Sequence, residues 1–433
     1  MLRLIFMVYH RLYYRKLKVM YRDRIPAKGP VIFVMNHQNA LMDALAILFN
    51  TPRQIVFMAR ADIFRKKVTA AILYFLKILP VYRIRDGFHA VDQNKEVFSE
   101  VISALEHHRP VALFPEGSHL GQRRLRPFKK GAARLAMQTL EANGFSHDVA
   151  VVPIGIYYSN YYHAGSDMLL VIGNPVSALA YKEQYLQNQP IALGSFTEEL
   201  YQKLDELVIN INNENHYQAF YEAIEMYYPV VLKQKKLKSS LFNIYSVKKE
   251  LAEKITVDLN NKEDQISALQ EELNRYQQKL KNLRIRDHQI SNPLRNRAYF
   301  FLKLFLSLVL LPIHLSGMLL NYLPYRLPIY LARNIKDPHF ISSVRFVYGL
   351  MFFIVWYLLL FIVSFIIFKP FYIGLVFILL SAFAGLFAFY HYKYLQKLRA
   401  DWRWMRLKKK DKSKFDELIR IRAEIMERVG KII

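Results

Sequence analysis

The stretch Val31-Ile32-Phe33-Val34-Met35-Asn36-His37-Gln38-Asn39-Ala40-Leu41-Met42-Asp43 joins an apolar run to a polar corner. Its first five residues are all apolar and three of them are β-branched, which is typical of a buried strand. The helix-like segment Ala40–Phe49 begins before the stretch ends. A strand that turns sharply into a helix is a building unit of α/β domains, so this stretch predicts an α/β fold.

The same alternation continues along the chain. Further strand-like runs are Ile55–Ala59, Val111–Pro115, Val149–Tyr158 and Met168–Ile172, and further helix-like segments are Ala90–Glu106 and Gly131–Glu141. Strands that alternate with helices favour a domain built around one sheet. We assign residues 25–230 to this domain and expect the chemistry of the protein to lie in it.

The polar corner itself carries a candidate catalytic pair. His37 follows the first strand, and Asp43 lies six residues further on, where the helix opens. A carboxylate that bonds one ring nitrogen of a histidine fixes its tautomer and stabilises the imidazolium. Such a pair removes a proton from a substrate hydroxyl without a nucleophile from the protein. A histidine in a polar turn is also a common cap or surface residue, so the pair alone leaves both interpretations open.

Two other segments hold candidate substrate-binding residues. Phe114-Pro115-Glu116-Gly117-Ser118 follows the strand-like run at 111–113, and loops at strand ends often contact substrate. Basic residues then crowd a short stretch, namely Arg123, Arg124, Arg126, Lys129 and Lys130. Either arginine of Pro80-Val81-Tyr82-Arg83-Ile84-Arg85-Asp86 could also hold a phosphate through two hydrogen bonds. The basic cluster suits a phosphate or coenzyme A, although a solvated charge run is the alternative.

These elements, together with the apolar block Val152-Pro153-Ile154-Gly155-Ile156, resemble in their order the phospholipid/glycerol acyltransferase superfamily. That superfamily includes the lysophosphatidic-acid and glycerol-3-phosphate acyltransferases. The resemblance covers residues 25–180, and the stretch from Phe114 to Gly131 is its most specific part. It implies an acyltransferase-like α/β domain that moves an acyl group from acyl-CoA or acyl carrier protein to a hydroxyl, without a cofactor.

The resemblance also implies a role for each matching residue. His37 would be the base, and Asp43 would orient it. Arg83, Glu116 and Gly117 would hold the acceptor, and Asn36, Ser118, Lys129 and Lys130 would complete the substrate contacts. Five residues separate His37 from Asp43, where four are common, and His119 stands where many relatives carry arginine. This spacing is closer to that of yeast-type glycerol-3-phosphate and dihydroxyacetone-phosphate acyltransferases, so the acceptor stays open between these compounds, lysophosphatidic acid and another lysolipid or amino-lipid.

Composition places the protein at a membrane. The formal net charge of +26 indicates a polyanionic partner, either nucleic acid or anionic lipid headgroups. Uncharged segments at Leu304–Leu323, Phe346–Phe368 and Phe371–Tyr390 each come near the ~20 residues that cross a bilayer as a helix. We therefore expect membrane lipids as partners rather than nucleic acid. A homodimer is compatible with the sequence.

We predict five parts along the chain. These are a basic amphipathic membrane-surface helix at 1–24, the catalytic domain at 25–230, a helical connector at 231–298, a membrane domain at 299–392 and a basic tail at 393–433 with Trp402 and Trp404 in the headgroup layer. The connector carries an apolar stripe that suits a docked helix or a short coiled coil, formed by Ile266, Leu269, Leu273, Tyr276, Leu280 and Leu283.

The charge pattern also predicts a topology. Basic segments flank the apolar ones, so both flanks should stay on the cytoplasmic side, which requires an even number of crossings. Only Lys369 and Pro370 separate the last two apolar segments, which favours a helical hairpin. We expect Leu304–Leu323, interrupted by Pro312 and Gly317, to be the segment that does not cross.

Rival functions find less support in the sequence. A lipase would carry a Gly-x-Ser-x-Gly elbow, which is absent, and the chain has no cysteine to act as a thiol nucleophile or a thiolate ligand. His107 and His108 are adjacent and no His-Glu-x-x-His block occurs, so we predict no metal site. No nucleic-acid-binding module is recognisable. A non-enzymatic basic membrane-associated protein remains the alternative.

Overall fold

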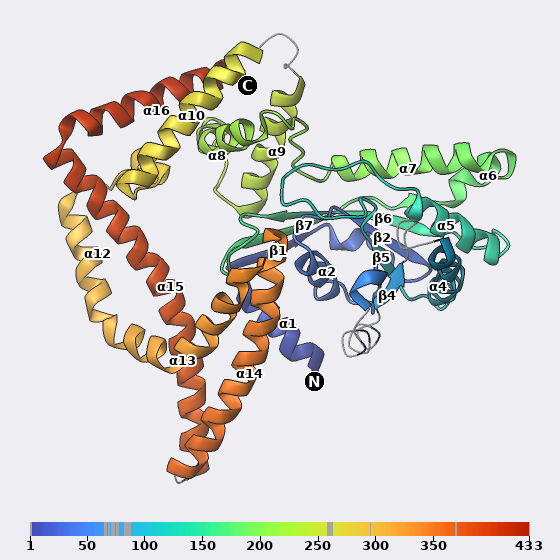
Figure 1. Cartoon of the computed structure of the whole chain (residues 1–433), viewed down its shortest axis with the longest axis horizontal. Helices are drawn as coiled ribbons and strands as arrows, with labels where there is room; N and C mark the ends of the chain where they lie inside the picture. Colours follow the sequence, from blue (N-terminus) through green and yellow to red (C-terminus); the bar gives the residue numbers. More distant parts are fainter. Residues whose placement is uncertain are drawn as a thin grey trace. The chain divides into compact units, whose positions relative to one another are not determined.

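The structure is a computed structural model that describes residues 2–64, 67, 70, 74, 78–81, 88–257, 263–294, 296–335, 337–368 and 370–432. The chain folds into two compact units (Figure 1). Unit 1 comprises residues 1–212, 239–249 and 336–343, and unit 2 comprises 213–238, 250–335 and 344–433. The two short later segments join unit 1 although they are distant from it in sequence. The five-part division along the chain stays a prediction.

Unit 1 is built around one sheet, as the alternation of strands and helices predicted. Among the described residues the sheet has eight strands: β1 Lys16–Met20, β2 Val31–Met35, β3 Val56–Arg60, β4 Ile78–Val81, β5 Val111–Leu113, β6 Ala150–Tyr158, β7 Asp167–Ile172 and β8 Val176–Ser177. Their order is β1-β7-β6-β2-β5-β3-β4, with β8 paired to β6. The fold class is thus confirmed as a mixed α/β domain.

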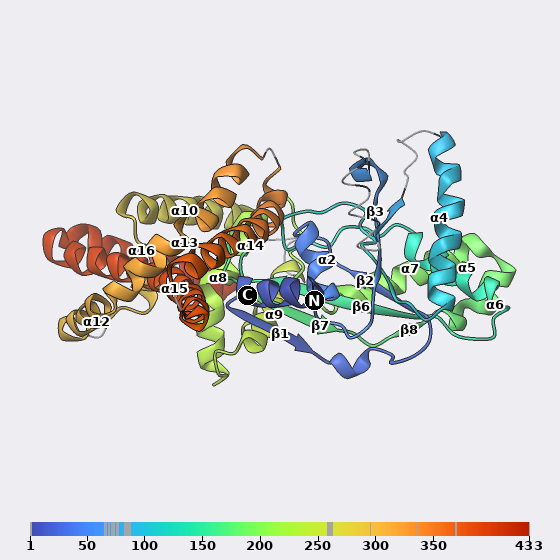
Figure 2. The same ribbon diagram turned by 90° about the horizontal axis from the view of Figure 1, so that it is seen from below.

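Most neighbouring strands are parallel, and β6 is antiparallel to β7 and β8. The strands β1, β7 and β6 run side by side in Figure 2. Strand β2 lies between β5 and β6 and is buried along its whole length, which explains its uninterrupted apolar sequence.

Helices cover the sheet and close its main core. They are α2 Leu41–Leu48, α4 Phe88–Glu106, α5 Gly131–Ala142, α6 Lys182–Gln187 and α7 Gln189–Asp205. Val101 of α4, Leu135 of α5 and Phe196 of α7 are fully buried in one apolar cluster with Ile32 and Val34 of β2. This cluster packs against one face of β2 and so holds in place the strand that leads into the corner.

The N-terminal segment corrects one prediction. Helix α1 covers Leu2–Tyr13 only, and residues 16–20 form the edge strand β1, paired in parallel with β7. Leu17 and Val19 alternate with Lys16 and Lys18, and this period of two suits a strand at the sheet edge, where the lysines reach water. The N-terminal helix is therefore shorter than predicted, and its location at a membrane surface stays a prediction. Several large apolar side chains of α1 are exposed, including Leu4 at 58%.

Unit 2 is helical. Its helices, two of which begin in unit 1, are α8 Tyr217–Gln234, α9 Leu241–Val257, α10 Glu263–Leu283, α11 Asp287–Ser291, α12 Arg297–Val309, α13 Leu311–Leu331, α14 Ile341–Ile367, α15 Phe371–Lys410 and α16 Lys412–Ile432. The predicted stripe of α10 is buried against α8 and α16, which makes α10 a docked helix. Trp404 is also buried there and stacks on Phe415, with ring centroids 4.3 Å apart. The prediction that Trp404 lies in the headgroup layer is therefore wrong, because this side chain is buried among the helices of unit 2. Trp402 is 46% exposed.

Two helical segments in the described part of the chain are long and apolar enough to cross a membrane. They are Pro338–Ile367 and Phe371–Lys410, and a stretch of 18 residues within each has a mean hydropathy of 2.9 and 2.3, respectively. The segments α12 and α13 would add a third span, but they meet at a bend of 51°. The bend precedes Pro312, as predicted. Gly317 does not contribute to it: it lies inside α13, and an added Cβ would collide with the backbone of Ala384 in α15, so this glycine permits close helix packing.

Candidate active site

Three neighbouring strands bring the candidate catalytic residues together. Strand β2 is parallel to both β5 and β6, so the carboxyl ends of all three meet at one edge of the sheet. His37 follows β2, Glu116 follows β5, and Tyr158 ends β6. Ligands of open α/β sheets bind outside the carboxyl ends of the strands, which makes this edge the candidate site.

His37 and Asp43 form the pair that their spacing suggested. Nδ1 of His37 lies 2.9 Å from Oδ2 of Asp43. The side chain of Asp43 is fully buried, while that of His37 is 16% exposed. With Nδ1 held by the carboxylate, Nε2 is the ring nitrogen that remains for a substrate proton. No described residue bonds Nε2.

Every contact of Asp43 fixes this arrangement. Oδ2 also accepts the backbone N–H groups of Gln38 at 2.8 Å and Asn39 at 2.7 Å. Oδ1 accepts the hydroxyl of Tyr158 at 3.0 Å. Burial, and then the charge of Asp43, raises the pKa of Tyr158, so this phenol stays protonated and donates. The sixth residue after the histidine can reach back because the corner passes through Ala40 with φ of 45°, a strained value for a side chain with a Cβ.

Two aromatic rings orient the imidazole of His37. Phe114 stacks on it with ring centroids 4.0 Å apart and an interplanar angle of 14°. His119 meets it edge to face at 5.4 Å. Both residues belong to the loop after β5, and Leu120 of the same loop donates its N–H to the carbonyl of His37 at 3.0 Å. The loop therefore forms one wall of the site.

Glu116 acts on His37 through the backbone. Its Oε1 accepts the N–H of His37 at 2.7 Å, and its Oε2 accepts the N–H of Arg126 at 3.3 Å. The residue is 4% exposed. Burial raises the pKa of Glu116 to about 8, although the two backbone hydrogen bonds oppose this shift. The geometry gives Glu116 a positioning role, and its predicted contact with substrate stays a prediction.

The predicted substrate-binding residues of the same loop divide into two groups. Gly117 has φ of 71°, and an added Cβ would lie 2.9 Å from Nζ of Lys129, so the ammonium group lies over the glycine. Ser118 accepts a hydrogen bond from the guanidinium of Arg126. Lys130 instead donates to the carbonyl of Pro190 in α7 at 3.1 Å. Lys129 and Arg126 thus provide cationic groups beside Gly117 and Ser118, while Lys130 contacts a different element.

Three other predictions have different outcomes. Asn36 is 1% exposed, and its amide both donates to and accepts from the backbone of Ile156, at 3.0 and 2.7 Å, so it joins β2 to β6 rather than presenting a free group to substrate. Arg123 is 3% exposed and lies over the ring of Tyr157 at 4.9 Å, so it is not part of an exposed phosphate-binding cluster. Arg83 lies outside the described residues, as does Arg85.

The structure adds residues that the sequence did not indicate. Asp337 and His339, from the short unit 1 segment at 336–343, lie against His119. In the same segment, the hydroxyl of Ser342 donates to Oδ1 of Asn39 in the corner after β2. Their separation from the catalytic corner by roughly 300 positions left no local pattern from which to find them.

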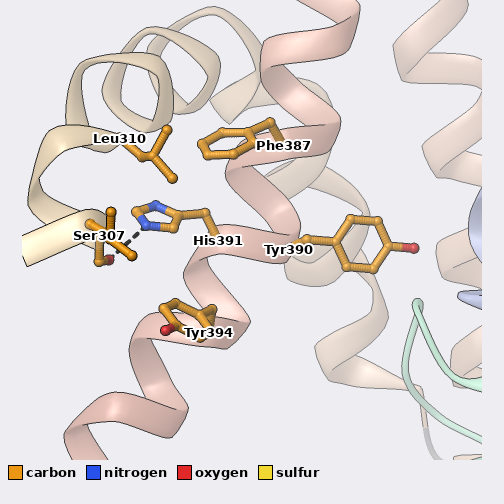
Figure 3. Close-up of a pocket in the computed structure, with 7 residues that line it drawn as sticks. Ser307, Leu310, Phe387, Tyr390, His391 and Tyr394 are labelled. Carbon is orange, nitrogen blue, oxygen red and sulfur yellow. Dashed lines mark hydrogen bonds between the residues drawn. The ribbon is translucent and has the colours of Figure 1, made fainter. Parts of the chain in front are cut away.

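Unit 2 has a separate cavity of about 390 Å³, drawn in Figure 3. Ser307 and Leu310 line it on one side, and Phe387, Tyr390 and His391 line it on the other. Nε2 of His391 and the hydroxyl of Ser307 are 2.7 Å apart. The lining is otherwise apolar or aromatic, and this cavity contains none of the predicted site residues.

Known proteins are similar to the part of the chain that contains the candidate site. Residues 16–157 match the family described as Acyltransferase. The 1-acyl-sn-glycerol-3-phosphate acyltransferase of Borreliella burgdorferi is 25% identical over 138 residues, which are 32% of this chain and 50% of the relative. The chain thus spans about half the length of this relative. The crystal structure of the 1-acyl-sn-glycerophosphate (LPA) acyltransferase PlsC from Thermotoga maritima aligns with 46% of this chain and 77% of that one, at 19% identity and a TM-score of 0.33.

The family match begins at β1 and ends within β6, so it contains the corner after β2 and the loop after β5. Residues 16–157 are thus similar in sequence to the acyltransferase family, and this similarity agrees with the resemblance to the phospholipid/glycerol acyltransferase superfamily.

Proposed function

We propose that this protein is a membrane-bound O-acyltransferase of phospholipid biosynthesis. It transfers a fatty acyl group from acyl-CoA or acyl carrier protein to a hydroxyl of glycerol-3-phosphate or lysophosphatidic acid. The observation that carries the proposal is the pair of His37 and Asp43 at the carboxyl end of β2, within the stretch that matches the acyltransferase family.

The proposed reaction is direct transfer. Nε2 of His37 takes the proton of the acceptor hydroxyl, and the hydroxyl oxygen attacks the carbonyl carbon of the thioester. The carbon–oxygen bond of the ester forms, the carbon–sulfur bond breaks, and the imidazolium returns its proton to the thiolate. Asp43 stabilises the imidazolium during this step. Such base catalysis accelerates a reaction by roughly 10²–10⁴.

The phosphate of the acceptor would lie beside the loop after β5. Lys129 and Arg126 supply positive charge there, and Gly117 leaves room for the side chain of Lys129. The family resemblance adds Arg83 as a further phosphate ligand. The proposed acyl transfer uses no metal and no cofactor.

We propose a multi-pass membrane location with the catalytic domain on the cytoplasmic face. The two long apolar helical segments support membrane insertion. Basic residues on both flanks favour the cytoplasmic side and would hold anionic substrate lipids near the site.

An acyl-transfer assay on purified membranes tests the proposal. It offers glycerol-3-phosphate, dihydroxyacetone phosphate and lysophosphatidic acid side by side, each with acyl-CoA and with acyl carrier protein. Acyl transfer to at least one acceptor, lost in His37→Ala, is the expected result. Membranes that transfer no acyl group to these acceptors or to other lysolipids and amino-lipids would favour the alternative, a non-enzymatic basic membrane-associated protein.

A further inference from the structure

Beside the catalytic pair, three side chains with metal-binding atoms converge. Nε2 of His119 lies 3.2 Å from Oδ2 of Asp337, and Nδ1 of His339 lies 2.7 Å from Oδ1 of the same carboxylate. One potential ligand atom from each residue lies within 4.8 Å of the others. All three residues belong to unit 1, although roughly 200 positions separate His119 from the other two.

We propose that His119, Asp337 and His339 bind a divalent transition-metal ion of the Zn²⁺ class. Two imidazoles and one carboxylate favour zinc or a similar ion over magnesium or calcium, which prefer oxygen ligands. Bonds of about 2.0–2.1 Å in a tetrahedral site separate two ligand atoms by roughly 3.3 Å. The two nitrogen–oxygen separations of 2.7 and 3.2 Å are close to this value, and all three ligand atoms lie within 4.8 Å of one another.

The surroundings fit a site that is already formed. The carboxylate of Asp337 accepts the backbone N–H of His339 at 3.0 Å, which fixes the direction in which it points. Gly121 leaves room for the imidazole of His339, because an added Cβ would collide with Cδ2 and Nε2 of that ring. Phe340 packs edge to face on His119 with ring centroids 4.8 Å apart. Neighbouring groups thus restrict the orientation of all three proposed ligands.

The site is open on one side. The side chains of His119, His339 and Asp337 are 12%, 25% and 44% exposed. Three protein ligands with access to water are typical of metal sites that keep a coordination position for water. Because the ring of His119 also contacts that of His37, at 5.4 Å, a bound ion would join segment 337–340 to the wall of the catalytic site.

The inference does not depend on acyl transfer, since metal binding is measurable without substrate. The full chain would be purified in detergent with a tag that contains no histidine, then treated with a chelator and dialysed. Zinc chloride is titrated by calorimetry, and the apparent melting temperature is measured with and without zinc. The absence of cysteine removes thiolate sites as competitors.

The variants His339→Ala and His119→Gln each remove one ligand, and His147→Ala is the control. His147 is exposed and its ring bonds only the neighbouring Ser146 among the contacts of the described residues. We expect about one zinc ion per chain in the wild type and the control, with a rise in melting temperature. Each ligand variant should bind zinc at least about tenfold more weakly, since even outer-shell changes reduce affinity by roughly 10–100-fold.

Two results would overturn the proposal. The first is zinc binding of equal affinity in the wild type and both ligand variants, which would locate the ion elsewhere. The second is no binding by the wild type, with a melting temperature that neither zinc nor chelator changes. The three side chains would then be only a hydrogen-bonded clasp. Melting temperatures in chelator show whether each variant is folded before zinc is added.

Discussion

Oε1 of Glu116 accepts the backbone N–H of His37 at 2.7 Å. This hydrogen bond joins the loop after β5 to the corner after β2. The Phe-Pro-Glu-Gly block and the block that contains His37 and Asp43 are therefore in direct contact. The side chain of His37 receives its orientation from Asp43 and Phe114, while Glu116 sets the position of its backbone. Glu116, the acid of the Phe-Pro-Glu-Gly block, thus positions the backbone of the proposed base.

His37→Ala should abolish acyl transfer while the protein still accumulates in membranes. The substitution removes the only proposed base, and the loss should reach roughly 10²–10⁴ in rate. The measurement is initial rate in membranes normalised to the amount of protein. His107→Ala is the control, because His107 is exposed and, among the described residues, its ring bonds only the carbonyl of Ser103 in α4. A rate above about a tenth of wild type would refute the assignment of His37.

Glu116→Gln should flatten the dependence of stability on pH. Burial raises the pKa of Glu116 to about 8 in the folded protein, above its ordinary value of 4.5. Between these values the folded state keeps a proton that the unfolded state has lost, so stability falls as pH rises from about 4.5 to 8. The contribution is on the order of a few kcal/mol.

The measurement is the apparent melting temperature in detergent at several pH values from 5 to 8. Other groups also titrate in this range. The contribution of Glu116 is therefore the difference between the wild type and the variant in how the melting temperature changes with pH. The wild type should lose more stability with rising pH than Glu116→Gln does. Parallel profiles would mean that Glu116 is ionised in the folded protein throughout the range.

Tyr158→Phe should lower kcat with little change in KM. The substitution removes the hydroxyl that donates to Asp43, and it leaves Oδ1 of a fully buried carboxylate without that donor. A hydrogen bond to a charged group contributes about 1.5–3 kcal/mol. Its loss removes one of the contacts that fix the carboxylate of Asp43, which in turn orients His37.

A double-mutant cycle with Asp43→Asn separates this effect from simple loss of packing. If Tyr158 acts through Asp43, the double variant should be no slower than Asp43→Asn alone. Additive losses of rate would show that Tyr158 affects the reaction by another route.

Gly117→Ala should impair acceptor binding more than stability. Gly117 has φ of 71°, and an added Cβ would also press against Lys129. Gly144→Ala is the matched control: Gly144 has φ of 62°, but nothing lies within 4 Å of its added Cβ. Both variants should lose about 1 kcal/mol of stability from backbone strain. Only Gly117→Ala should raise KM for the phosphorylated acceptor, and an equal KM in both variants would remove Lys129 from the acceptor site.

The sequence predicted those parts of the site that depend on local pattern. Strand β2, its polar corner and helix α2 are continuous in the chain, so the apolar run and the spacing from His37 to Asp43 sufficed. Contacts between distant segments left no such signal. Tyr158 was predicted only as the end of an apolar strand, and its bond to Asp43 depends on β6 lying next to β2.

The same limit applies to segments with mixed patterns. Residues 16–20 were predicted as part of a helix, because apolar and basic residues are mixed along the whole of residues 1–20. Pairing with β7, a tertiary contact, decides in favour of a strand. His119 differed visibly from the family pattern, yet only the fold brings Asp337 and His339 to it.

The last prediction concerns membrane topology. We expect α14 and α15 to cross as a hairpin, with the catalytic domain and the C-terminal helix α16 both on the cytoplasmic side. Basic residues flank the apolar segments on both sides, and a bilayer core accepts helices because they satisfy their own backbone. Single cysteines report on this without background, since the native chain has none. An impermeant thiol reagent should label Lys28→Cys and Lys412→Cys only after cells are opened, and Tyr372→Cys, next to the turn, in intact cells. Labelling of Lys412→Cys in intact cells would show an odd number of crossings, and the bent pair of α12 and α13 would then be the third span.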